Sequence, residues 1–337
     1  MREVWVAMGT VSEADVPAVA GRPSRQWSFV PRGGRSDGGG ELTARIVSSR
    51  VSLRNRLREL WHARELFVFL VRKDLKVKYK NSFLGFLWSM LNPAFVLLVY
   101  YVVFKYFLKN PTPSFALYLF AGLVVWNLFQ TATTGSASVI VANAGIVKKV
   151  AFPREILALS QVGTASVFFF FQALVLILFL VGFQYSPAWG YLPIALFSLV
   201  DLIVFSAALA IFLSAVNVYF RDVEHLILVL LNAWFWGVPI IYSYNLVYGL
   251  FARHHLVWLA RLYLANPVTT FVLAFQRAIY GKVFVHITGN SHYPVLANYP
   301  YHFYVELLAG QLGAAILLLF GAMLVFGRIS GNFAEEL

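Results

Sequence analysis

The sequence predicts an all-α, polytopic membrane protein with six transmembrane helices, an N-terminal amphipathic interface helix and a re-entrant helical hairpin before the last span. Of the 337 residues, 60% are apolar and only 12% are charged, about half the charge content of a soluble domain. Uncharged runs of about 20 residues, which suffice to cross a bilayer, recur along the chain. The net charge of +12 is unevenly placed, which favours a cytoplasmic membrane face and argues against nucleic acid as a partner.

The N-terminal segments carry most of the basic surplus and are predicted to stay in the cytoplasm. Residues 1–49 are rich in Gly, Arg, Ser and Pro, which predicts a disordered basic tail. Residues 50–82 are predicted to form an amphipathic and basic interface segment. Its apolar side chains Leu53, Leu57, Leu60 and Trp61 recur with helical spacing. This pattern is typical of a helix that lies along the membrane surface.

Residues 83–327 are predicted to form the transmembrane domain, followed by a cytoplasmic tail at 328–337. The six predicted spans are 83–104, 115–141, 156–182, 191–216, 226–242 and 306–326. Between 243 and 304 no segment both lacks charge and reaches spanning length. Two short helices separated at Asn266-Pro267, which enter the outer leaflet and return, are therefore expected there. Clusters of Lys and Arg in alternate loops predict that both termini are cytoplasmic.

Two features within the predicted spans are open to more than one interpretation. The small and hydroxylic side chains of residues 131–138 permit close helix contact or line a polar path. Asp201 is the single acid well inside a predicted span. An intramembrane carboxylate suggests a functional role, and a buried hydrogen bond to a neighbouring helix is the structural alternative.

The sequence contains no recognisable nucleotide or metal site. No Gly-x-x-x-x-Gly-Lys-[Ser/Thr] motif occurs, so this chain is not expected to be an ATPase. No His-Glu-x-x-His motif occurs, and the adjacent His254 and His255 lie on different faces of a helix, so no metal is predicted. The lack of cysteine excludes disulfides and thiolate catalysis.

Aromatic residues make up 17% of the chain, more than interfacial belts require. A subset could line a passage, because flat rings cover the C–H faces of sugars and tolerate sliding, as base stacking tolerates sequence. The candidate channel-lining residues are Trp88, Phe95, Tyr100, Trp126, Trp234, Trp236 and Tyr242.

Four segments together resemble the membrane subunit of ABC-2-type polysaccharide exporters, the family that moves O-antigen, teichoic acid and related lipid-linked glycans. They are Arg72–Pro93 with its Ser-Phe-Leu-Gly-Phe-Leu-Trp motif, Ile146–Glu155, Asn217–His225 with Pro239–Tyr242, and Asn266-Pro267. The resemblance covers about residues 60–330. In detail the chain is most similar to actinobacterial exporters of the galactan precursor of arabinogalactan.

The resemblance implies a homodimer of this chain in the inner (plasma) membrane with two copies of a separate ATP-binding cassette subunit. That partner would bind ATP and Mg²⁺, so no cofactor is expected on this chain. The cargo would be a polyprenyl-diphosphate-linked polysaccharide moving to the outer side. Residues that would couple to the ATPase are Lys148, Lys149, Phe152, Pro153, Arg154, Glu155, Arg221 and Asp222. Cations that could contact the lipid diphosphate, or simply hold the orientation, are Arg72, Lys73, Lys76, Lys78 and Lys80.

Two rival functions are considered. An integral-membrane glycosyl- or acyltransferase acting on a lipid-linked glycan would need acids or histidines at a membrane boundary. The candidate cluster for that chemistry is His254, His255, His286, His292 and His302. An ion-coupled carrier would need more intramembrane charge and an internal repeat, and no convincing repeat is present.

Overall fold

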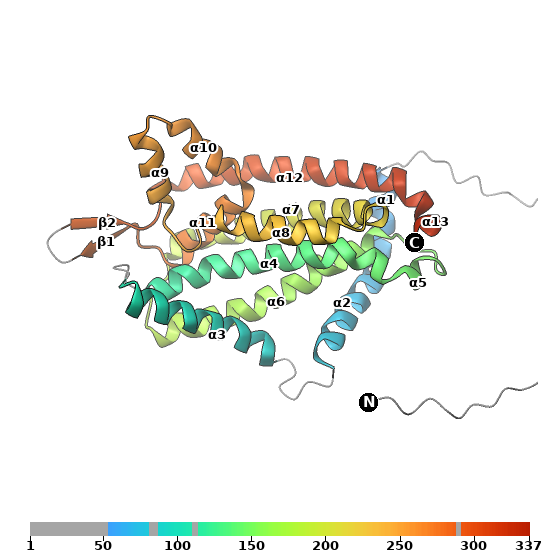
Figure 1. The fold of residues 1–337 in the computed structure, drawn as a ribbon, viewed down its shortest axis with the longest axis horizontal. Helices are drawn as coiled ribbons and strands as arrows, with labels where there is room; N and C mark the ends of the chain where they lie inside the picture. The colour runs from blue at the N-terminus through green and yellow to red at the C-terminus, as the bar shows by residue number, and fades with distance from the viewer. Residues whose placement is uncertain (1–52, 81–86, 110–113, 288–290) are drawn as a thin grey trace, which may run out of the picture. The chain divides into compact units, whose positions relative to one another are not determined.

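The computed structural model describes residues 53–80, 87–109, 114–287 and 291–337, which are almost entirely helical (Figure 1). The all-α prediction holds for these residues apart from one short antiparallel pair, β1 (Phe284–Ile287) and β2 (Ser291–Pro294). This hairpin lies within residues 243–304, between the predicted helical hairpin and the last predicted span. The predicted disordered tail at 1–49 lies outside the described residues.

Five helices in the described part of the chain are long and apolar enough to cross a membrane. They are α3 (Trp88–Val102) continued by the π-helix η2 (Val103–Phe107), α4 (Phe115–Ala142), α6 (Glu155–Gly182), α7 (Leu192–Tyr219) and α12 (Tyr301–Ile329). These helices correspond to predicted spans one to four and six. The four longest have 28 or 29 residues. At 1.5 Å per residue they are about 42 Å long, so they extend beyond a hydrocarbon core of about 30 Å.

The predicted fifth span, 226–242, differs from the structure in its second half. Helix α8 (Val223–Trp236) has 14 residues and is about 21 Å long, so it falls short of a full span. Gly237 and Pro239 end the helix, and the chain continues to Tyr242 without helical hydrogen bonds. The Tyr118 hydroxyl donates to the carbonyls of Pro239 (3.2 Å) and Tyr242 (2.9 Å). Irregular backbone at this depth is therefore satisfied by protein groups.

Three short helices follow: α9 (Tyr244–Arg253), α10 (Val257–Ala265) and α11 (Pro267–Ile279). Helices α10 and α11 meet at an angle of 88°, at the Asn266-Pro267 break that the sequence predicts. The Asn266 side chain accepts a hydrogen bond from the Val268 amide (3.2 Å), and Pro267 occupies the first helical position. Helix α11 is buried against α4 and α7. A re-entrant path through the membrane remains a prediction.

Helix α4 is the central helix of the bundle and packs on α3, α6, α7, α8 and α11. Its small residues allow close contact with α6, because a Cβ at Gly135 would lie 2.7 Å from the Gln161 side-chain oxygen. The Thr133 hydroxyl donates to the Phe129 carbonyl of its own helix (2.7 Å), and Ser136 likewise donates to Ala132. Of the two interpretations of residues 131–138, the structure therefore favours close helix packing.

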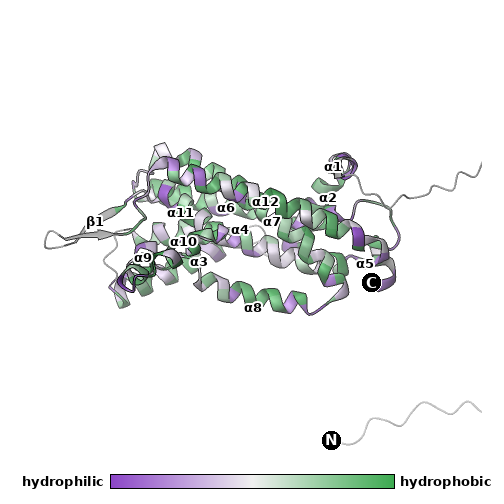
Figure 2. Ribbon diagram, turned by 90° about the horizontal axis from the view of Figure 1, so that it is seen from above, coloured by the Kyte–Doolittle hydropathy of each residue, from purple (hydrophilic) through white to green (hydrophobic). Residues whose placement is uncertain are grey.

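The connecting segments of the bundle gather at two ends (Figure 1). The C-terminal end, at the right of Figure 1, comprises α1 (Leu53–His62), α5 (Ala144–Val147), the α7–α8 turn and the terminal helices η4 (Ser330–Asn332) and α13 (Phe333–Glu336). The hairpin end comprises η3 (Trp189–Tyr191) in the α6–α7 turn, α9, α10 and the β-hairpin. Apolar residues dominate the long helices between these ends (Figure 2).

Candidate functional site

The predicted interface segment forms two helices, α1 and α2 (Arg64–Tyr79), with a break at Ala63. The side chain of Leu60 packs against the protein core. Leu57 and Trp61 instead remain 47% and 69% exposed. An exposed apolar edge on a short basic helix is suited to a membrane surface or to a partner protein.

A buried ion pair joins α1 to the start of α6. The Arg56 guanidinium donates to the carboxylate of Glu155, and the two side chains are only 17% and 7% exposed. Gly327 of α12 makes room for this pair, because a Cβ there would lie 2.9 Å from the guanidinium carbon. Three segments far apart in the sequence therefore meet at Arg56. The partner of Arg56 lies 99 positions away in the sequence, so the local pattern around Arg56 does not reveal the pair.

Arg154 connects the same loop to the C-terminal tail. Its guanidinium donates to the Ser330 carbonyl and lies 5.6 Å from the ring centroid of Phe333. The Tyr219 hydroxyl at the end of α7 donates to the Ile329 carbonyl (2.9 Å). The loop before α6, the end of α7 and the chain terminus are thus held together by hydrogen bonds and ring contacts. Nothing in the sequence pattern pointed to Phe333 or Ser330 in this role.

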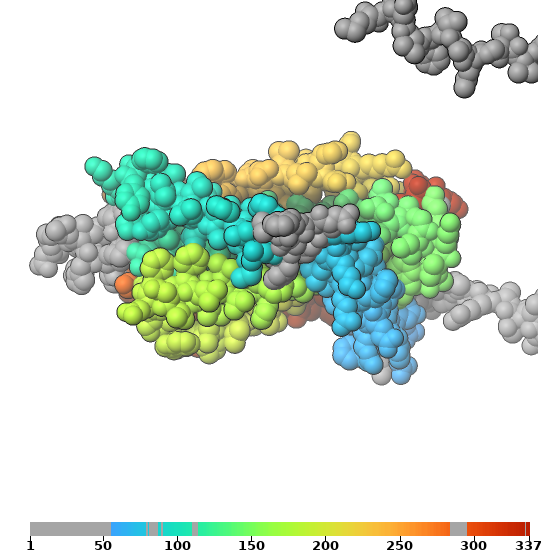
Figure 3. All heavy atoms as spheres, turned by 90° about the horizontal axis from the view of Figure 1, so that it is seen from below, coloured from blue at the N-terminus to red at the C-terminus, as the bar shows by residue number. Residues whose placement is uncertain are grey.

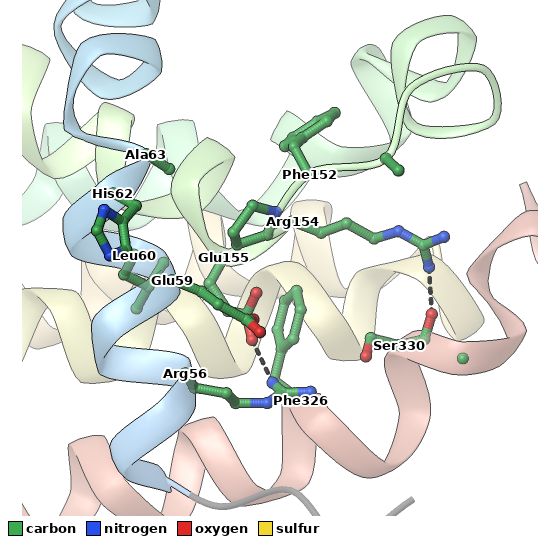
Figure 4. A pocket seen from close by; sticks show the side chains of 13 residues that line it. Arg56, Glu59, Leu60, His62, Ala63, Phe152, Arg154, Glu155, Phe326 and Ser330 are labelled. Atoms are coloured by element: carbon green, nitrogen blue, oxygen red, sulfur yellow. Dashed lines mark hydrogen bonds and ion pairs between the residues drawn. The ribbon is translucent and has the colours of Figure 1, made fainter. Parts of the chain in front are cut away.

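These groups surround a cavity of about 620 Å³ at the C-terminal end. In Figure 4 the side chains of α1, the loop before α6 and the end of α12 point toward it. Of the eight predicted coupling residues, four line the cavity: Phe152, Pro153, Arg154 and Glu155. Four others are exposed at the same end: Lys148, Lys149, Arg221 and Asp222. The structure brings this predicted set to one end of the bundle, where it could receive a soluble partner.

Polar contacts and close packing anchor α2 on the bundle. The Lys73 ammonium donates to the Asn143 side chain (3.1 Å), and the Gln161 amide donates to the Asp74 carboxylate (2.6 Å). At Gly163 of α6, an added Cβ would lie 2.6 Å from the Phe67 ring and 2.9 Å from Val71. Lys73 therefore has a structural contact, whichever role its charge has in addition.

Lys78, near the end of α2, borders a second cavity of about 410 Å³. Its ammonium lies 3.9 Å from the ring centroid of Phe168, and partial burial lowers the pKa of Lys78 below its ordinary value. The cavity also has polar and aromatic lining residues, among them Trp88, Asn92, Asn127, Thr131 and Gln172. The remaining predicted diphosphate contacts are exposed: Arg72, Lys76 and Lys80.

The predicted channel-lining aromatics divide into an interior and an exposed group. Trp126 is 2% exposed and packs on Phe129 and Phe235 in the protein core. Trp234 packs on Phe129 and donates to the Asn266 side chain (3.2 Å). The half-buried Tyr100 also packs on the core, and the hydroxyl of the half-buried Tyr242 lies 3.1 Å from the Tyr263 hydroxyl. The exposed group is Trp88 at 49%, Phe95 at 55% and Trp236 at 66%.

These exposed aromatics belong to α3 and α8, which cover one face of the bundle (Figure 3). Helix α8 buries only Leu231 among its 14 residues. Leu226, Val229 and Leu230 are examples of its exposed apolar residues. Because most apolar side chains of α8 are exposed within this chain, the face is available to lipid, to cargo or to another polypeptide.

Asp201 is completely buried within α7, and neither carboxylate oxygen has a hydrogen-bond partner in the described part of the chain. Of the two interpretations of Asp201, the structural one, a buried hydrogen bond to a neighbouring helix, is therefore not formed among the described residues. In the same described residues, His, Asp and Glu side chains form no group of three or more suited to a metal ion.

The long apolar helices and the pocketed end with its exposed lysines define a helical polytopic membrane protein. Residues 65–280 match the ABC-2 type transporter family, and the chain belongs to that family.

The chain is also similar to permeases of O-antigen export systems and to a polysialic acid transport protein. The O-antigen export system permease protein RfbA of Myxococcus xanthus is 34% identical over 226 residues, which cover 66% of this chain and 84% of the relative. The permease of the same name from Klebsiella pneumoniae is 28% identical and covers 81% and 95%. The polysialic acid transport protein KpsM of Escherichia coli is 26% identical and covers 48% and 64%.

Proposed function

We propose that this chain is the permease subunit of an ABC exporter that carries a polyprenyl-diphosphate-linked polysaccharide of the cell envelope, such as galactan or O-antigen. The cargo would move from the cytoplasm to the outer side of the inner membrane. The observation that carries the proposal is the exposed aromatic face of α3 and α8, in a chain whose relatives are polysaccharide export permeases. Aromatic faces suit a glycan because they pack on its C–H surfaces without selecting one hydroxyl pattern.

Two copies of a separate ATP-binding cassette subunit would dock at the C-terminal end, which would face the cytoplasm together with both chain termini. The exposed Lys148 and Lys149 and the cavity beside them supply a charged, concave surface for such a partner. The Arg56–Glu155 and Arg154–Ser330 contacts link this surface to α1, α6 and α12. A push on the loop before α6 would therefore reach several helices together.

The permease would act as a homodimer through the face formed by α3 and α8. Helix α8 fully buries only Leu231 within one copy, so its exposed apolar residues, such as Leu226, Val229 and Leu230, are available to the second copy and to cargo. Trp88, Phe95 and Trp236 would then lie where a passage between two copies could form.

The basic stretch of α2 would hold the lipid diphosphate at the membrane boundary. Arg72, Lys76 and Lys80 have exposed cationic groups, which form charge-assisted hydrogen bonds to phosphate oxygens. Lys78 borders the cavity that also contains Trp88, so a phosphate contact and a sugar contact would be neighbours.

Depletion of the protein, followed by fractionation of lipid-linked glycans, tests the transport function. Accumulation of the glycan on the inner side with loss outside is expected, and purification from membranes should bring down an ATPase. Normal glycan distribution after depletion, or glycosyl or acyl transfer by the isolated chain, would overturn the proposal.

The coupling surface is tested by charge reversal. Lys149→Glu should lower transport-coupled ATP hydrolysis of the assembled complex without affecting insertion, because Lys149 is exposed and supports no described contact. Arg154→Glu should have the same effect but also loosen the tail, since Arg154 bonds Ser330. Lys109→Glu at the hairpin end serves as a matched control. Unchanged export in the Lys149 variant would discard the coupling assignment.

A further inference from the structure

An apolar groove at the hairpin end lies between α6 and α7 and is not used by the proposed transport function. It has a volume of about 630 Å³, and residues from α6, α7 and α11 line it, including Leu176, Leu180, Leu196, Leu199, Phe275 and Ile279. The lining of α6 runs from Phe169 to Val181. Twelve helical steps correspond to about 18 Å, somewhat more than one leaflet of a hydrocarbon core of about 30 Å. The groove is therefore long enough for a lipid chain.

The residues at the outer mouth of the groove mark a membrane boundary. Tyr185 and Trp189 line the mouth, and Trp189 is 67% exposed. Tyrosine and tryptophan concentrate at the level of the lipid headgroups, where their rings contact hydrocarbon and their polar atoms contact water. A chain lying in the groove would thus have its headgroup beside the α6–α7 turn.

A cation is held at this mouth by the fold. Gly281 adopts φ +68° and contacts the α6–α7 turn so closely that a Cβ would lie 2.9 Å from Ala188. This contact puts Lys282 beside the mouth, with its ammonium 4.9 Å from the ring centroid of Tyr185. Lys282 is exposed and has no acidic partner in the described part of the chain. A second cation, Arg277, lies 4.1 Å from the Tyr191 ring.

The charges at the hairpin end favour an anionic headgroup over a zwitterionic one. The acid of α12 at this end is Glu306, whereas the cations of the hairpin end are Lys105, Lys109, Arg253, Arg261, Arg277 and Lys282. Such a surplus attracts anionic lipid at the membrane surface. Residues of α6 line the groove, and α6 lies at the opposite edge of Figure 3 from α8. A lipid there would leave the α3 and α8 face free.

We propose that this groove binds an anionic glycerophospholipid of the leaflet at the hairpin end. One acyl chain lies between α6 and α7, and Lys282 contacts the phosphate. This site does not involve the transported polymer, so the experiment on the groove tests it independently of the proposed transport function.

Native mass spectrometry of the full chain, equilibrated with phosphatidylglycerol and phosphatidylcholine of identical acyl chains, tests the site. The natural chain should retain phosphatidylglycerol preferentially. Lys282→Glu should weaken that preference by roughly 30-fold, the effect expected for replacing a cation with an anion near a phosphate. Ala173→Phe, which fills the groove from a half-buried position, should reduce retention of both lipids. Arg58→Glu, on α1 at the opposite end of the bundle, is the control and should behave like the natural chain.

Equal retention of the two lipids by the natural chain would overturn the proposal. So would unchanged phosphatidylglycerol retention in both the Lys282 and the Ala173 variants. Retention of a polyprenyl phosphate in place of phosphatidylglycerol would assign the groove to an isoprenoid lipid and also overturn it.

Discussion

Replacing Arg56 with alanine should release helix α1 from the bundle while leaving the spans in place. In the structure Arg56 is the group of α1 that pairs with Glu155, and it lies on Gly327 of α12. Few other contacts hold α1, because Leu57 and Trp61 are exposed. Loss of the guanidinium would leave a carboxylate with a 7% exposed side chain and no cation bonded to it.

The expected size of the effect follows from this burial. Breaking a buried ion pair by removing one partner costs about 3–5 kcal/mol, because the other charge stays desolvated. Arg56 is 17% exposed, so the lower limit of about 3 kcal/mol is appropriate. If α1 opens as a unit, a change of about 3 kcal/mol raises the open population roughly 150-fold.

Hydrogen–deuterium exchange of the amides of α1, followed by mass spectrometry, measures this opening directly. The exchange rate should rise roughly 150-fold in Arg56→Ala and about twofold at most in Arg58→Ala, an exposed arginine of the same helix. The double variant Arg56→Ala with Glu155→Gln should recover much of the protection, because no charge then remains buried without a partner. Equal exchange in the Arg56 and Arg58 variants would refute the role of the ion pair.

Two further predictions concern the interior of the bundle. Gly163→Ala should lower the free energy of unfolding of the purified protein by about 1–3 kcal/mol, because the Cβ of the new alanine would overlap Phe67 of α2. A thermal melt measures this loss. Gly182→Ala, with nothing within 4 Å, is the control, and a similar loss in both would contradict the packing argument. Asp201→Asn should keep yield and thermal stability close to those of the natural chain, since no cation or donor bonds to the carboxyl in the described residues. Loss of export at unchanged stability would instead reveal a functional acid, and strong unfolding would reveal a paired carboxylate.

The membrane-spanning segments could be predicted from the sequence alone. Uncharged runs long enough to cross a bilayer identified α3, α4, α6, α7 and α12. A helix that crosses the hydrocarbon core must be apolar along the whole thickness of that core, and this requirement is visible in the sequence. The break at Asn266-Pro267 was also predictable, since an asparagine cap and a proline at the first helical position act locally. Such features depend on neighbouring residues in the chain.

The shortened fifth helix could not be predicted in the same way. The apolar run continues past Gly237 and Pro239 to Tyr242, so composition favoured one helix. The helix ends at Gly237 and Pro239, and the irregular backbone that follows is accommodated because Tyr118, on another helix, satisfies the carbonyls of Pro239 and Tyr242. That partner lies 121 or more positions away, where a sequence pattern carries no signal.

The sequence by itself determined that this chain is a helical membrane protein, where five of its long apolar helices lie, and that basic residues gather in the loops and in α2. Composition and local charge decide these properties, because water and hydrocarbon act on each segment separately. Only the tertiary structure decided which charges are free. It buried Arg56 against Glu155, attached Arg154 to the tail and set Lys282 beside an apolar groove. Each of these contacts joins residues that are neighbours only after the helices pack.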